Sequence, residues 1–149
     1  MIKTSTQKVL VEFKYVTREY ANTVDGMEIK VKNHMAFNIR RYDCWKDIER
    51  IETFSKSKES DVDYGYFVLI TNVCGLWNKR KSNNSLDIEF CVDDGIHKSG
   101  ERNWKKWASK GRELPIKTSN DYNFKYDPFY DFKDSQKYGE FKSLVVEID

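Results

Sequence analysis

Residues 64–73, YGYFVLITNV, decide the fold, because they form a near-continuous apolar run of strand length. Such a run is typical of a central strand that is covered on both faces, as in α/β sheets. We therefore predict a buried strand in the middle of a sheet at this point of the chain.

The stretch before it, 37–54, has helical periodicity. Its apolar residues recur every three or four positions and form one stripe, made of Ile39, Tyr42, Trp45, Ile48 and Ile51. Asn38 is a suitable N-cap. The sequence therefore predicts the main helix of the domain here.

Residues 8–16, KVLVEFKYV, are predicted to form a strand that precedes the helix. Glu12 and Lys14 are two positions apart, so both side chains leave the same face. The opposite face is apolar and is expected to be buried. Strand, helix and buried strand in this order form a right-handed crossover unit. The fold class is therefore α/β, with α+β as the alternative, and has a mixed central sheet with one main helix after the E-x-K strand.

The remaining segments give weaker signals. Residues 24–32 alternate around an Asp-Gly turn and predict a hairpin strand. Residues 85–95 fit a strand or a short helix, 119–139 resemble a loop, and 139–149 fit a closing strand. No repeat or linker divides the chain, so we predict a single domain over 1–149.

Net charge, cysteine spacing and hydropathy argue against three classes: dedicated nucleic-acid binders, disulfide or zinc proteins, and membrane-spanning proteins. The formal net charge of +2 is too small to indicate a dedicated nucleic-acid binder. Cys44, Cys74 and Cys91 are odd in number and widely spaced, which argues against a disulfide framework or a zinc site. No window approaches the length of an apolar membrane span. We expect a cytoplasmic protein that does not associate with a membrane.

The pair Glu12 and Lys14 is the first candidate for chemistry. Metal-dependent nucleases need oxygen ligands for Mg²⁺ and a cation near the scissile phosphate, and an E-x-K strand supplies one of each. On spacing alone, the commoner explanation is a solvated strand face.

Four segments, 11–15, 40–52, 64–72 and 130–148, resemble a family of uncharacterised bacterial proteins with restriction-endonuclease-like, PD-(D/E)XK-type architecture. In that family an E-x-K strand is followed by a helix with the pattern R-Y-D-x-x-K-D-I-x-R-x-E and by a strand ending in T-N. The likeness covers only the C-terminal part of the family pattern. It implies a restriction-endonuclease-like core that lacks its N-terminal portion, with Glu12 and Lys14 as catalytic residues and Glu12 as a Mg²⁺ ligand.

The chain departs from this pattern before Glu12. The family places a metal-binding aspartate upstream of E-x-K, but residues 1–11 contain no acidic residue. A lone carboxylate rarely holds Mg²⁺. Asp25, Glu28 or a second copy of the chain could supply the missing ligand. The preferred interpretation is an inactive site without a cofactor.

Basic residues are the second set of candidates. Arg40 and Arg41 could form a phosphate-facing cluster with Lys14, although Arg41 pairing with an acid near the helix is the favoured alternative. Lys79, Arg80 and Lys81 could contact a nucleic acid or another partner. A solvated basic loop is the commoner explanation.

Three functions follow. The first is a nuclease-fold protein without nuclease activity that binds a protein or a nucleic acid, for example an inhibitor of a host defence nuclease encoded by a mobile element. The second is an active Mg²⁺-dependent nuclease. The third is a subunit that completes its sheet with a separate N-terminal chain, since edge strands invite pairing. A homodimer is also possible.

Overall fold

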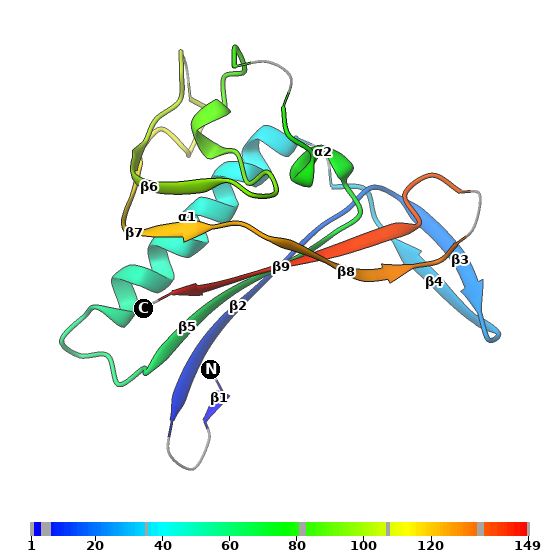
Figure 1. The fold of residues 1–149 in the computed structure, drawn as a ribbon, viewed down its shortest axis with the longest axis horizontal. Coiled ribbons are helices and arrows are strands. Elements are labelled where there is room, and N and C mark those ends of the chain that lie inside the picture. The colour runs from blue at the N-terminus through cyan, green and yellow to red at the C-terminus, as the bar shows by residue number, and fades with distance from the viewer. Residues whose placement is uncertain are drawn as a thin grey trace.

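The computed structural model describes residues 2–3, 7–34, 36–80, 83–106, 108–133 and 136–148. Its main element is a five-stranded mixed sheet in the order β1-β2-β5-β9-β8 (Figure 1). The strands are β1 (Ile2–Lys3), β2 (Lys8–Val16), β5 (Tyr64–Thr71), β9 (Glu140–Ile148) and β8 (Tyr126–Asp131). β2 and β5 are parallel, and the other neighbours are antiparallel. The predicted mixed sheet is confirmed.

One long helix, α1 (Phe37–Ser55), precedes β5 in the chain and covers one face of the sheet. Its apolar stripe places Trp45, Ile48 and Ile51 in the core with Phe67 and Leu69 of β5. Helix and strand approach closely because β5 carries a glycine, Gly65. A Cβ atom at that position would collide with the Ile51 side chain.

Two two-stranded antiparallel sheets flank this core. β3 (Tyr20–Val24) and β4 (Met27–Val31) form the predicted hairpin, with Asp25 and Gly26 at positive φ in the turn. β6 (His97–Arg102) pairs with β7 (Ile116–Asn123), and Trp45 of α1 packs against Phe124, just after β7. The short α2 (Cys74–Trp77) and the 3-10 turn η1 (Ile88–Phe90) complete the fold.

Some local predictions were wrong. Residues 119–139 are not a loop: most of β7 and all of β8 lie there. Asn38 does not cap α1; the N-cap is Ala36, at a φ of 63°, and no side chain caps the helix. The chain enters the helix through this left-handed residue instead.

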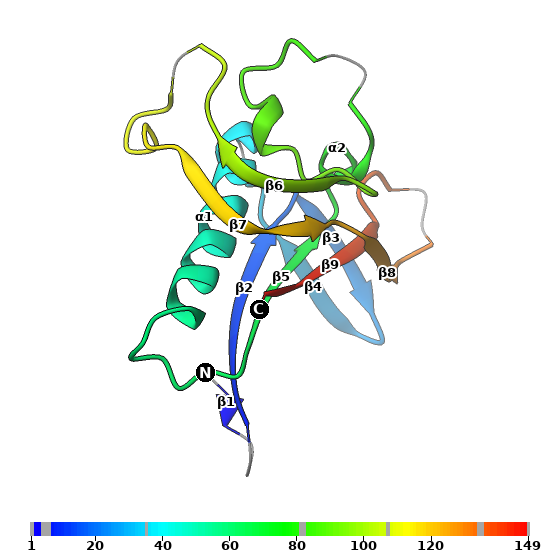
Figure 2. The same ribbon diagram turned by 60° about the vertical axis from the view of Figure 1, so that its left-hand side comes forward.

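The two faces of β2 are reversed relative to the prediction. The polar residues Glu12 and Lys14 face α1, whereas the apolar face is left open: Phe13 is 69% exposed and Tyr15 is 47% exposed. On that side the β3–β4 hairpin covers only one end of the sheet, where Ile70 packs near Tyr20 (Figure 2). The central strand β5 is therefore fully covered on one face only.

Among the described residues, no helix combines the length and apolar character that crossing a bilayer would require.

Candidate functional site

Glu12 and Lys14 project from the centre of β2 toward α1, as expected from their two-residue spacing. Glu12 Oε1 lies 2.9 Å from Arg50 Nη2, and Lys14 Nζ lies 2.6 Å from Asp47 Oδ2. Both charged groups of the E-x-K strand are therefore paired with the helix.

Arg50 and Asp47 are three residues apart on α1 and also pair with each other. Arg50 Nη2 lies 3.2 Å from Asp47 Oδ1, so one guanidinium bridges the carboxylates of Glu12 and Asp47. We call these four residues, Glu12, Lys14, Asp47 and Arg50, the strand–helix cluster. Two acidic and two basic groups give it no formal net charge.

Asp47 and Arg50 are the two members of this cluster that were not among the predicted site residues. Their i,i+3 spacing places the two side chains near each other on a helix, but it does not show which way they face. In the structure Asp47 is buried against β2. Burial raises the pKa of its carboxyl group, and the hydrogen bond from Lys14 opposes this rise only in part.

The capacity of this cluster for a metal is limited. Glu12 and Asp47 offer two carboxylates, but Arg50 lies between them. Within the described ranges, no three His, Cys, Asp or Glu side chains are grouped as a metal site would require. The alternatives Asp25 and Glu28 belong to the β3–β4 hairpin, which projects away from α1, and Glu28 pairs with Lys30 (Figure 1).

Arg40 and Arg41 at the start of α1, which could have formed a phosphate-facing cluster with Lys14, both pair with acidic residues. Arg41 is buried, and its Nη1 donates to Asp87 Oδ2 at 3.0 Å. Arg40 pairs with Asp43 at 3.6 Å, and Asp43 is also held by Arg112 at 2.7 Å. The alternative in which Arg41 pairs with an acid is confirmed.

Arg80 also pairs with Asp87, through two hydrogen bonds of 2.9 Å and 2.7 Å. We call Asp87, Arg41 and Arg80 the Asp87 cluster. Burial alone would raise the pKa of Asp87, but hydrogen bonds from Arg80 and Ser85, with the charge of Arg41, hold that pKa well below its ordinary value. This cluster ties the loop after α2 to the start of α1.

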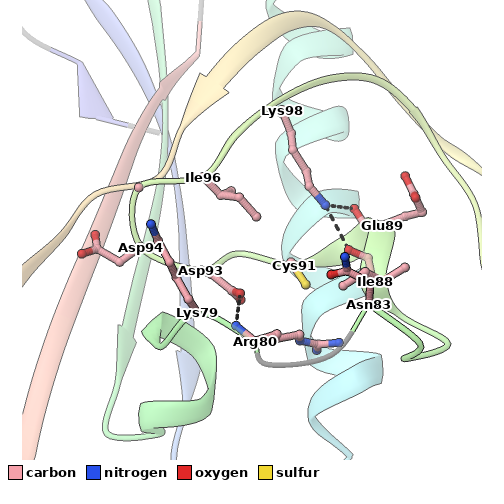
Figure 3. A pocket seen from close by; sticks show the side chains of 11 residues that line it. Lys79, Arg80, Asn83, Ile88, Glu89, Cys91, Asp93, Asp94, Ile96 and Lys98 are labelled. Atoms are coloured by element: carbon pink, nitrogen blue, oxygen red, sulfur yellow. Dashed lines mark hydrogen bonds between the residues drawn. The ribbon is translucent and has the colours of Figure 1, made fainter.

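A pocket of 460 Å³ adjoins this loop (Figure 3). Lys79 and Arg80 line it, whereas Lys81 lies outside the described residues. Lys98 also lines the pocket, and its amine donates to the carbonyl oxygen of Glu89 at 2.8 Å. Burial raises the pKa of the Cys91 thiol, which disfavours the nucleophilic thiolate. The lining carries both signs of charge and does not form a uniform phosphate-binding surface.

The exposed apolar residues on the side of the sheet away from α1 form a second surface, which the sequence analysis assigned to the core. The register aligns Phe13 with Val68 and Val68 with Val145 across three strands. Phe13 and Val145 are both exposed, as is Tyr15. We call the four residues Phe13, Tyr15, Val68 and Val145 the open face. Alternation along β2 revealed two faces but not which one the helix covers.

Comparisons with known proteins found no match to a family model, to a curated protein or to a solved structure.

Proposed function

We propose that this protein acts by binding another protein and does not itself cleave nucleic acids, although it keeps a nuclease-like E-x-K strand. The observation that carries the proposal is the strand–helix cluster. In it Arg50 pairs with Glu12, and Asp47 pairs with Lys14.

These ion pairs keep both Glu12 and Lys14 from the roles that phosphodiester hydrolysis would require of them. Mg²⁺ prefers several oxygen ligands in octahedral geometry, and its entry next to Glu12 would first have to displace the Arg50 guanidinium. A lysine that stabilises a phosphate must offer its charge to the substrate, but Lys14 already lies 2.6 Å from Asp47. The site therefore favours an ion-pair network over catalysis.

The surface supports a protein partner over a nucleic acid. Arg40, Arg41 and Arg80 all pair with aspartates, so phosphate binding would have to compete with existing ion pairs. The open face instead presents aromatic and aliphatic side chains, the type that protein interfaces bury. An inhibitor of a defence nuclease is one kind of protein that would use such a surface.

An active Mg²⁺-dependent nuclease is the second candidate. It is favoured by one observation: Glu12 and Asp47 both reach the same Arg50 nitrogen, so movement of Arg50 would leave two carboxylates beside Lys14. The side chain of Arg50 is 60% exposed and has room to move.

A cleavage assay separates the two candidates. Purified protein is incubated with supercoiled plasmid and with single-stranded RNA in Mg²⁺ or Mn²⁺, alongside Glu12→Ala, Lys14→Ala and Arg50→Ala. We expect no metal-dependent cleavage by the wild type. Cleavage that is lost in both Glu12→Ala and Lys14→Ala would establish the nuclease instead. Cleavage by Arg50→Ala alone would show that this arginine suppresses a latent site.

A mobility-shift titration across salt tests the choice of partner. Lysine and arginine contacts to phosphates weaken steeply as salt rises, because bound counterions are released on binding. We expect no shift at low salt. A salt-sensitive shift that is reduced in Lys79→Ala would make a nucleic acid the partner.

A further inference from the structure

The hydrogen bonds at the two ends of β2 show which of its residues point their backbone N–H and C=O groups toward β5. Lys8 and Asp63 exchange hydrogen bonds at the start of β5, with Lys8 N–H donating to the Asp63 carboxylate at 2.6 Å and Asp63 N–H donating to the Lys8 carbonyl at 2.8 Å. Beyond the other end of β2, Arg18 N–H donates to Asn72, which follows β5. Even-numbered residues of β2 therefore direct their N–H and C=O groups toward β5, and odd-numbered residues direct theirs toward the outer edge.

The two ends of this outer edge are occupied. In the described residues, β1 pairs with β2 opposite Lys8 and Val9. At the far end Thr17 and His34 pair: Thr17 N–H donates to His34 Nδ1 at 3.2 Å, and His34 N–H donates to the Thr17 carbonyl at 2.7 Å.

Between these ends, three residues of β2 face outward. The backbone N–H and C=O groups of Val11, Phe13 and Tyr15 meet no other strand in the described part of the chain (Figure 1). An unpaired edge with apolar side chains is a template for another strand, and proteins normally cover or charge it. The open stretch is centred on Phe13.

We propose that a second copy of this chain pairs antiparallel along this edge, with the two-fold axis at Phe13. Phe13 then lies opposite the partner's Phe13, and Val11 lies opposite the partner's Tyr15. Each of these positions is a hydrogen-bonded pair that exchanges two backbone hydrogen bonds, because the odd-numbered residues point outward. The pairing uses residues 10–16 of each copy, the stretch between β1 and His34.

The charges of Glu12 and Lys14 favour this register over an axis at either of those two residues. With the axis at Phe13, Glu12 lies opposite the partner's Lys14, at a non-hydrogen-bonded position where side chains are closest. An axis at Glu12 or at Lys14 would place like charges opposite each other. The Glu12 side chain is 36% exposed, so it can contact a second cation besides Arg50.

The dimer would also extend the open face. A two-fold axis perpendicular to the sheet keeps the same face of both copies on one side. Phe13 lies in one row with Val68 and Val145, so two such rows would meet at the axis. The use of this joined surface for binding rests on the proposed function, whereas the strand pairing does not.

Sedimentation equilibrium from micromolar to millimolar protein tests the pairing. We expect a mass of two chains for the wild type and of one chain for Phe13→Pro. Proline at this position removes an outward N–H and leaves the hydrogen bonds to β5 intact. The matched control is Val145→Lys, which changes the open face but not the edge and should stay dimeric. Circular dichroism of each variant verifies that it is folded.

Disulfide trapping tests the register. In a Cys74→Ser background, Phe13→Cys should cross-link to its own copy under mild oxidation, because hydrogen-bonded antiparallel pairs have Cα atoms about 5.5 Å apart and disulfides form at roughly 4.4–6.8 Å. The control Tyr15→Cys should not cross-link, since its two copies would lie about 13 Å apart along the strand. The remaining cysteines, Cys44 and Cys91, are buried.

Three results would overturn the proposal: a monomeric wild type at every concentration, a Phe13→Pro variant that remains dimeric, or cross-linking at Tyr15 and not at Phe13. These outcomes are independent of the cleavage assay. A monomer that does not cleave would remove the dimer alone, and a dimer that cleaves would remove the proposed function alone.

Discussion

Two of the ion-pair clusters in the described residues, the Asp87 cluster and the strand–helix cluster, lie in different surroundings. In the Asp87 cluster, the side chains of Asp87, Arg41 and Arg80 are 4%, 10% and 14% exposed. In the strand–helix cluster, Glu12 and Arg50 are 36% and 60% exposed. The first cluster lies inside the fold and the second opens to solvent at one side.

Because of this difference in exposure, we assign a structural role to the Asp87 cluster, whereas the ion pairs of the strand–helix cluster can rearrange. Removing one partner from a buried ion pair leaves an uncompensated charge in a poorly solvated place, whereas water and salt screen an exposed pair. Arg41 and Arg80, two of the arginines that the sequence suggested for binding, therefore hold the loop after α2 in place through Asp87. We expect the partly exposed pair of Glu12 with Arg50 to contribute little to stability and to be able to exchange partners.

The largest effect is expected from Asp87→Asn. This change leaves Arg41 and Arg80 without their shared carboxylate, and we expect the free energy of unfolding to fall by about 3–5 kcal/mol. Urea titration followed by circular dichroism measures it. The control Asp43→Asn, which removes the more exposed pair with Arg112, should cost less. Equal losses in the two variants would remove the distinction between buried and exposed pairs.

Lowering the pH should change the contributions of Asp87 and Asp47 to the free energy of unfolding in opposite directions. The folded pKa of Asp87 lies below its unfolded value, so its carboxylate stabilises the fold above about pH 4, the unfolded value, and this contribution is lost as the pH falls. The folded pKa of Asp47 is raised, so its contribution is present below the unfolded value and is lost as the pH rises through the folded one.

Unfolding measured in urea from neutral pH down to pH values below about 4 tests these signs. Relative to the wild type, stability should fall less steeply with acid in Asp87→Asn and more steeply in Asp47→Asn. Identical slopes in both variants would contradict the assigned pKa directions.

The smallest effect is expected from Glu12→Gln. Its pair with Arg50 is partly exposed, and such pairs contribute about 0–1 kcal/mol. A double-mutant cycle of Glu12→Gln with Arg50→Gln isolates the coupling between the two side chains. A coupling as large as the loss in Asp87→Asn would show that this cluster is also a structural element.

Periodicity alone predicted the strand–helix–strand unit, because β2, α1 and β5 carry long, regular apolar patterns. It failed where tertiary contacts override local preference. β7 contains the polar run TSNDYN, yet it forms a strand because it pairs with β6 and its buried residues pack against α1.

The face of β2 and the role of the arginines were also beyond sequence reasoning. Glu12 and Lys14 face the helix because Arg50 and Asp47 supply complementary charges at the matching height, which depends on how α1 is placed over the sheet. Arg41 and Arg80 meet at Asp87, which is 46 residues from Arg41 in the chain. The spacing of a single sequence does not contain that contact.

Titration of the wild type with Mn²⁺, followed by the electron paramagnetic resonance of the free ion, tests most directly whether Arg50 and Lys14 leave a usable metal site beside Glu12. We predict that no stoichiometric binding occurs, and that Arg50→Ala binds more Mn²⁺ than the wild type. One bound equivalent in the wild type, lost in both Glu12→Gln and Asp47→Asn, would contradict the account.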